Sequence, residues 1–234
     1  RSFGLFSNGE TIEQGAGGTR DLVEPASGAP FGTVHLAGEA DVDAAVAAAR
    51  AALDGGWGRT GGTERSRLLH ALADAIAANR AVLIDLEARN VGKAVSSVKA
   101  EIGGAVECFR FYASAIGTIG GRSNAMGASL LSYTLKEPVG VAAQIVPWNY
   151  PLLMAVWKLA PALAAGCSVV LKTDPQTPAS ALRIAQLAGE VGFPAGAINV
   201  ISADGPTVGD YLVRHPGVDK VAFTGSTEVG HLVM

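Results

Sequence analysis

Apolar residues recur at helical spacing through the first half of the chain. Between residues 41 and 119 they follow one another every three or four positions, which predicts a series of amphipathic helices. Thr63 is expected to cap one of them, and further helices are expected over 81–91 and 98–116. The apolar face of the first predicted helix consists of Val42, Ala45, Val46, Ala49 and Leu53.

The pattern changes at Val139, where short apolar runs begin to alternate with helical segments. The runs VGVAAQIV, SVVLK, AINVI and KVAFT are each followed by a helical pattern, and these helices begin near Pro151, Pro178, Gly205 and Ser226. Four strand–helix units within about 95 residues predict an α/β fold with a parallel, doubly wound sheet of the Rossmann-like kind.

A glycine-rich break separates these two parts. The stretch GTIGGRSNAMG begins at Gly117, and the alternation of residues over 129–135 predicts an exposed hairpin or arm. The chain is therefore divided into a helical part over 1–116, an arm over 117–138 and strand–helix units over 139–234.

Composition and charge exclude several classes of partner. Of the 234 residues 49% are apolar and the net charge is −3, so a sizeable core is expected and no general attraction to nucleic acid or membranes. No apolar run reaches the roughly 18 residues of a membrane span, and RSFGLFSNGE does not resemble a secretory signal, so a soluble, cytoplasmic protein is expected. Cys108 and Cys167 have no metal-ligand or redox spacing; both are expected to be buried, and no metal site is predicted.

The chemistry is expected in the loops that follow the four predicted strands. The carboxyl ends of parallel strands lie at one edge of a sheet, so the loops that hold Asn149, Lys172, Gly205 and Gly225 should face one crevice. This arrangement predicts a single site assembled from four separate loops.

Two of these loops have the chemistry of a nucleotide site, and some of their residues also have an ordinary structural interpretation. Gly225 and Ser226 could bind a pyrophosphate through backbone N–H groups, or could form a glycine turn with a serine N-cap. Lys172, at the end of a buried strand, could reach a ribose or a phosphate. Asp174 could accept hydrogen bonds from a ribose or form an Asx turn.

The loop Pro147-Trp148-Asn149-Tyr150-Pro151 carries a different kind of group. The side-chain amide of Asn149 could donate a hydrogen bond to a developing oxyanion, or Asn149 could simply form a turn. Tyr150, Met154 and Trp157 follow at positions i, i+4 and i+7 and so share one helical face, a pattern more usual for core packing.

The segments PWNYPLLMAVWKLAPALAAGCSVVLK and FTGSTEVG resemble the aldehyde dehydrogenase superfamily. The similarity extends over nearly the whole chain, through the NG turn at Asn8, PASG at Pro25, DVDAAVAAA, VGK at Gly92 and GFPAGAINVI. The resemblance implies oxidation of a small-molecule aldehyde with NAD or NADP, in which a cysteine thiolate attacks the aldehyde and a glutamate-activated water releases the acid. At Tyr150 and Trp157 the chain also resembles the betaine-aldehyde and aminoaldehyde branch, for which cationic aldehydes are substrates.

The resemblance also implies roles for individual residues. Asn149 would donate to the oxyanion, and Lys172 would bind the adenosine ribose or the 2′-phosphate of NADP. Further cofactor contacts would come from Val146, Pro147, Trp148, Gly205, Phe223, Gly225 and Ser226. The aldehyde tunnel would be lined by Tyr150, Met154 and Trp157. The arm would join subunits into a homo-oligomer, a dimer or a tetramer.

The chain departs from the family pattern in ways that limit these expectations. The nucleophilic cysteine and the water-activating glutamate would follow Met234, so this segment alone is expected to be inactive, and the strands that complete the arm would follow as well. Pro175 stands where the family usually has a ribose-binding glutamate, so the resemblance does not decide whether the cofactor is NAD or NADP. The alternatives are a non-catalytic short relative that binds a nucleotide or caps a longer partner, and a reductase of acyl phosphates or acyl-CoA.

Overall fold

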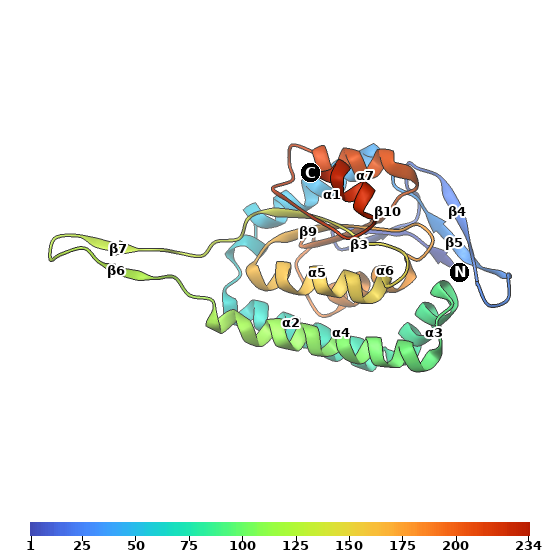
Figure 1. Ribbon diagram of the computed structural model, residues 1–234, viewed down its shortest axis with the longest axis horizontal. Coiled ribbons are helices and arrows are strands. Elements are labelled where there is room, and N and C mark those ends of the chain that lie inside the picture. Colours follow the sequence, from blue (N-terminus) through green and yellow to red (C-terminus); the bar gives the residue numbers. More distant parts are fainter.

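The computed structural model describes residues 1–234, and its centre is a six-stranded sheet in the order β11-β8-β9-β10-β2-β3 (Figure 1). Strands β8 to β11 run parallel, as predicted from the second half of the chain. These strands span Val141–Ile145, Ser168–Thr173, Ile198–Ser202 and Lys220–Phe223. The fold is α/β, as expected, but β2 (Leu5–Ser7) and β3 (Glu10–Ile12) add an antiparallel edge that the sequence did not predict.

Helices cover both faces of this sheet (Figure 1). On one face lie α5 (Pro151–Ala165) and α6 (Ala179–Glu190), and on the other lie α1 (Glu39–Asp54) and α7 (Gly205–Arg214). Every residue of β9 and β10 is buried, which is the usual state of parallel strands between two helical layers.

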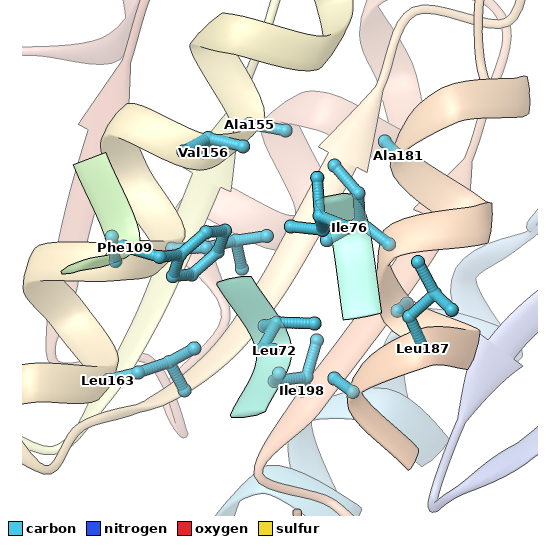
Figure 2. Packing of buried hydrophobic residues seen from close by; sticks show 14 of the residues in the cluster. Leu72, Ile76, Phe109, Ala155, Val156, Leu163, Ala181, Leu187 and Ile198 are labelled. Carbon is cyan, nitrogen blue, oxygen red and sulfur yellow. The ribbon is translucent and has the colours of Figure 1, made fainter. Parts of the chain in front are cut away.

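A third layer of helices packs beneath α5 and α6. It contains α2 (Gly62–Ala78), α3 (Arg80–Val91) and α4 (Val95–Ala115), and α4 lies along α5. Figure 2 shows how Leu72 and Ile76 of α2 and Phe109 of α4 meet Val156 of α5 and Leu187 of α6 in one continuous core. Helix α5 thus packs against the sheet on one side and against α2 and α4 on the other, and these contacts fix the position of its first turn.

The helices predicted over 41–119 are confirmed, with one error at an N-terminus. Thr63 was expected as a cap, but α2 already begins at Gly62, and Gly61 supplies the extended N-cap backbone whose carbonyl accepts from the Arg65 amide. Thr63 therefore lies inside the first turn. Two short 3-10 helices, Trp57–Arg59 and Ile116–Thr118, and the last helix α8 (Thr227–Val233) complete the set. No helix is long and apolar enough to cross a membrane.

The first 38 residues are not helical, which corrects the prediction of a helical part over 1–116. Besides β2 and β3 they form a separate three-stranded sheet of β1 (Ser2–Phe3), β5 (Pro30–His35) and β4 (Thr19–Val23). These strands are two to six residues long, too short for a clear period of two. Strand β2 also depends on a partner that is distant in sequence, because it pairs with β10 near the other end of the chain.

The predicted arm is present as a two-stranded hairpin that projects away from the body (Figure 1). Its strands β6 (Ser123–Ala125) and β7 (Leu131–Tyr133) are antiparallel and shorter than the predicted segment over 129–135. The large apolar side chains exposed on this arm are Met126, Leu130, Leu131, Tyr133 and Leu135.

Asn199 fastens the N-terminal strand β2 to the parallel sheet. Its side-chain oxygen accepts from the Ser7 hydroxyl and the Asn8 amide, both at 3.0 Å. Its side-chain nitrogen donates to the carbonyls of Val169 at 3.1 Å and Gly196 at 2.8 Å. The amide is fully buried and fully hydrogen-bonded, so its loss would leave several buried polar groups without partners.

Asn199→Ala is therefore expected to lower the free energy of unfolding by about 2–4 kcal/mol, measured by urea denaturation. Ser7→Ala is the matched control, because it removes only one of the four hydrogen bonds and should cost about 1 kcal/mol. Equal effects of the two substitutions would show that Asn199 does not organise this junction.

Candidate functional site

A cavity of about 580 Å³ opens at the carboxyl edge of the parallel strands, between α7 and α8. This volume falls in the range of small-molecule and cofactor sites. The cavity brings together three of the predicted cofactor residues, Lys172, Gly205 and Phe223. Its apolar walls include Ile145, Pro206 and Val229.

Lys172 is the buried cation of this cavity. It is the penultimate residue of β9, at the carboxyl end of the strand; it is 8% exposed, and its Nζ donates to the Ala203 carbonyl at 3.0 Å. Burial lowers the pKa of the Lys172 ammonium, and the carboxylates of Asp174 and Asp204 act in the opposite direction. With a longer contact of 3.5 Å to the Thr173 carbonyl, the ammonium has two carbonyl partners and two nearby carboxylates, and its third N–H can donate to a ligand.

Both carboxylates near Lys172 accept a hydrogen bond from a backbone amide of their own loop. Asp174 Oδ1 accepts from the Gln176 amide at 2.9 Å, which is the Asx turn considered for it from the sequence. Asp204 is the N-cap of α7: Oδ1 accepts from the Gly205 amide at 2.9 Å and Oδ2 pairs with the Arg20 guanidinium at 3.0 Å. Sequence reasoning missed Asp204, although an Asp placed between an apolar strand and Gly-Pro is a recognisable cap signal.

The turn between β11 and α8 needs glycine because of the Phe223 ring. A Cβ atom at Gly225 would collide with that ring, which forms part of the cavity wall. Ser226 is the N-cap of α8, and its hydroxyl accepts from the Val229 amide at 3.2 Å. Gly225 and Ser226 do not themselves line the cavity, so the structure shows their capping role and leaves pyrophosphate binding as a prediction.

The loop that carries Asn149 lies outside this cavity. Val146 is buried and its amide donates to the Lys172 carbonyl at 3.2 Å, and Pro147 follows it half-buried. Trp148 is 56% exposed and lines a second hollow of about 390 Å³, which Arg20 also lines. Arg20 thus lines the second hollow and pairs with Asp204, the residue before Gly205 of the first cavity.

Asn149 itself is exposed, and its side-chain amide makes no hydrogen bond within the protein. The loop backbone is nevertheless held, because the Thr177 hydroxyl donates to the Trp148 carbonyl at 3.2 Å. A fixed loop with a free amide donor is the arrangement that stabilisation of an oxyanion requires.

The aromatic residues that follow Asn149 are not core residues. Tyr150 and Trp157 are 43% and 52% exposed, whereas Met154 between them is half-buried against the main core. The ordinary core-packing interpretation therefore applies to Met154 and is wrong for the two aromatic rings. Tyr150 has the Lys93 ammonium over its ring, 3.9 Å from the centroid.

Neither cysteine has the surroundings of a nucleophile. Cys167 is buried, as predicted, and Cys108 is half-buried on α4 with a pKa raised by burial, which opposes thiolate formation. Neither residue lines the cavity at the sheet edge. No group of three or more His, Cys, Asp or Glu side chains is placed to hold a metal ion.

Comparisons with known proteins agree with this geometry. Residues 12–234 match the model of the aldehyde dehydrogenase family. The chain is 46% identical over 231 residues to an aldehyde dehydrogenase of Emericella nidulans, and this match covers 99% of the chain and 46% of the relative. The chain therefore spans about half the length of the curated relatives that it matches.

Solved structures give the same result. An NAD+ complex of aldehyde dehydrogenase from Bacillus cereus superposes with a TM-score of 0.96 at 42% identity, covering all of this chain and 48% of that one. A betaine aldehyde dehydrogenase from Staphylococcus aureus, also in complex with NAD+, gives a TM-score of 0.95 at 38% identity, covering 99% of this chain and 47% of that one. From its sequence, its fold and the cavity at its sheet edge, the chain belongs to the aldehyde dehydrogenase family.

Proposed function

We propose that this chain supplies the cofactor site and one oxyanion-stabilising residue of an NAD(P)-dependent aldehyde dehydrogenase. The observation that carries the proposal is the cavity at the carboxyl edge, where a buried lysine, a glycine at a helix N-terminus and an aromatic wall meet. Similar structures that contain NAD+ support the choice of cofactor.

The residues of the cavity fit the adenosine half of a dinucleotide. Gly205 has a φ of 67°, a left-handed conformation that favours glycine, and no atom lies within 4 Å of the position of its Cβ, so the backbone is open to a ligand there. The methylene groups of Lys172 pass along Gly209 of α7 and direct the ammonium toward the strand ends. When bound, the nicotinamide of the cofactor accepts the two electrons that leave the aldehyde carbon.

Asn149 would act on the aldehyde oxygen. Its free amide stands on a loop fixed by Thr177 and by the first turn of α5, so the donor would be in place before charge develops on the oxygen. Such a donor lowers the barrier because it needs no reorganisation during the reaction.

Asn149→Ala in the whole protein should lower kcat by about 10²–10³, with little change in the Kd of NAD+. Steady-state kinetics with a chemical step shown to be rate-limiting would measure this effect. Asn149→Asp is the matched variant, since it keeps the size but replaces the donor with a charged acceptor and should be at least as damaging. An unaltered kcat would return Asn149 to the role of a turn residue.

We propose that the site accepts NADP+ as well as NAD+. Pro175 is buried and offers no charge, while Asp174 and Asp204 are engaged in their own loops. Lys172 is then the charge that meets a 2′-phosphate, and of the two carboxylates that line the cavity, Glu39 and Asp210, Asp210 is paired with Arg214.

Titration with both cofactors is expected to give dissociation constants within about tenfold of each other. Lys172→Met should weaken NADP+ by roughly tenfold or more, and NAD+ by less, because a phosphate loses a charge-assisted hydrogen bond. Lys136→Met on the exposed arm is the control. A strong preference for NAD+ that Asp174→Ala or Asp204→Ala abolishes would show that one of these carboxylates replaces the missing glutamate.

For the substrate, we propose an aldehyde of the neutral kind in preference to a cationic one. The resemblance to the betaine-aldehyde and aminoaldehyde branch at Tyr150 and Trp157 implies a cationic substrate, but the Lys93 ammonium already lies over the Tyr150 ring. The face of the ring that Lys93 covers is not open to a second cation, and two cations would share one ring quadrupole. This argument weakens the assignment to the betaine-aldehyde and aminoaldehyde branch.

We further propose that the arm joins this chain to a second copy. Its strands carry exposed apolar side chains, including Leu131 at 77% and Leu135 at 69%, and the hairpin has no packing partner within the body. A two-stranded hairpin is marginal alone in water, so pairing with further strands would stabilise it. A homo-oligomer follows from this, with the number of subunits left open.

A further inference from the structure

A cluster of buried charged and polar side chains lies beneath the loop that carries Asn149. Glu87 and Asn90 come from α3, Lys93 from the turn after it, and Glu101 from α4. Glu87 is 1% exposed and Glu101 is 8% exposed, in a region that is otherwise apolar. Buried charges are costly unless they are paired, so the function of this cluster needs an explanation.

Lys93 is the centre of the cluster. Its Nζ lies 2.8 Å from Glu101 Oε2, 3.5 Å from Glu87 Oε1 and 3.9 Å from the centroid of the Tyr150 ring. Two carboxylates thus hold the ammonium from the side of α3 and α4, and the aromatic face receives it from the side of α5. The Lys93 side chain is only 15% exposed, so this cation–π contact is partly desolvated and stronger than one between two fully exposed groups.

Tyr150 is the connection between this cation and the site. It is the N-cap residue of α5 and follows Asn149 directly, yet its side chain makes no capping hydrogen bond. The contact of its ring with Lys93 is therefore a tertiary restraint on the residue next to the free amide. A shift of the ring would move the backbone that carries Asn149.

The same cluster approaches the first turn of α5 from a second direction. Burial raises the pKa of Glu87, while the nearby Ser180 hydroxyl and Leu152 amide lower it. Neither carboxylate oxygen of Glu87 makes a hydrogen bond of good geometry. Asn90 ties the neighbouring loop, because its Nδ2 donates to the Gln176 carbonyl at 2.8 Å and its Oδ1 accepts from the Ala179 amide at 3.3 Å.

From these contacts we infer that Lys93 is a positioning residue that sets the Asn149 amide through the ring of Tyr150. The inference rests on the proposed function of Asn149 and extends it to a residue that does not touch the substrate. The competing explanation is that Lys93 only neutralises Glu87 and Glu101. In that case its removal would destabilise the fold without a specific effect on the reaction.

Kinetics of the whole protein separate these explanations. Lys93→Met should lower kcat about 10- to 100-fold, because a small misplacement of a reacting group is costly, while the KM for NAD+ changes by less than about twofold. Lys93→Arg should retain most of the activity, since a guanidinium also stacks on an aromatic face and pairs with carboxylates. Lys99→Met, an exposed lysine on α4, should leave kcat unchanged.

A double-mutant cycle identifies the route through Tyr150. In a Tyr150→Leu background the further change Lys93→Met should have little effect on kcat, because the contact is already lost. Additive losses in the cycle would overturn the inference. A Lys93→Met protein with a lowered Tm and an unchanged kcat would overturn it as well.

Hydrogen exchange tests the inference without any activity. Lys93→Met should speed amide exchange over residues 148–154 by roughly fivefold or more relative to Lys99→Met, because the restraint on the first turn of α5 is removed. If the wild-type protein oxidises no aldehyde but this local change occurs, the proposed function fails and the positioning of the loop by Lys93 stands. Unchanged exchange over this segment would overturn the inference.

Discussion

The parallel pairing of β8 with its neighbours β9 and β11 is the constraint on which the site depends. The register places Ile145 opposite Lys172 on one side and opposite Phe223 on the other, and Lys172 opposite Ile201 of β10. Three residues from strands far apart in sequence therefore stand in one row at the carboxyl edge, and Ile145, Lys172 and Phe223 all line the cavity. A shift of one strand by a single residue would turn its side chain to the opposite face and remove it from this row.

The loops above that edge are held from below by the third helical layer. Asn90 of α3 binds the loop after β9, and Lys93 contacts Tyr150 in the loop after β8. The loop after β9 has its own Asx turn, whereas the loop after β8 is held by contacts with Thr177 and Lys93. An ion cluster in this place contributes little net stability, because desolvation of its charges offsets their attraction. The cluster and Asn90 instead contact both the loop after β8 and the loop after β9, and so hold the two loops in place together.

Residues at fixed places in a strand–helix unit could be predicted from the sequence. Lys172 ends an apolar strand and Gly205 begins a helix, so both were assigned to the crevice from local pattern alone, and the cavity contains both. The pairing of β2 with β10 could not be predicted, because it depends on a buried Asn199 some 190 residues away along the chain. Lys93 could not be predicted either, since no local pattern brings VGK beside the Tyr150 ring.

The residues around Lys172 come from separate segments of the chain, so a single sequence motif cannot identify all of them. Asp174 stood out because it follows Lys172 in sequence, but the Asp204 carboxylate also raises the pKa of that lysine and belongs to the next strand–helix unit. The Arg20 that pairs with Asp204 comes from the N-terminal sheet, which the hydrophobic pattern did not indicate at all. Charge around Lys172 thus comes from three segments that meet only in the folded chain.

The most direct test of this account is a crystal structure of the protein grown with ADP, the half of the cofactor that the cavity should hold. The account predicts that the adenosine group lies between the Phe223 wall and α7, with its ribose within hydrogen-bonding distance of Lys172 Nζ. A nucleotide bound elsewhere on the chain, with the cavity between α7 and α8 free of it, would contradict the assignment of this edge of the sheet as the cofactor site.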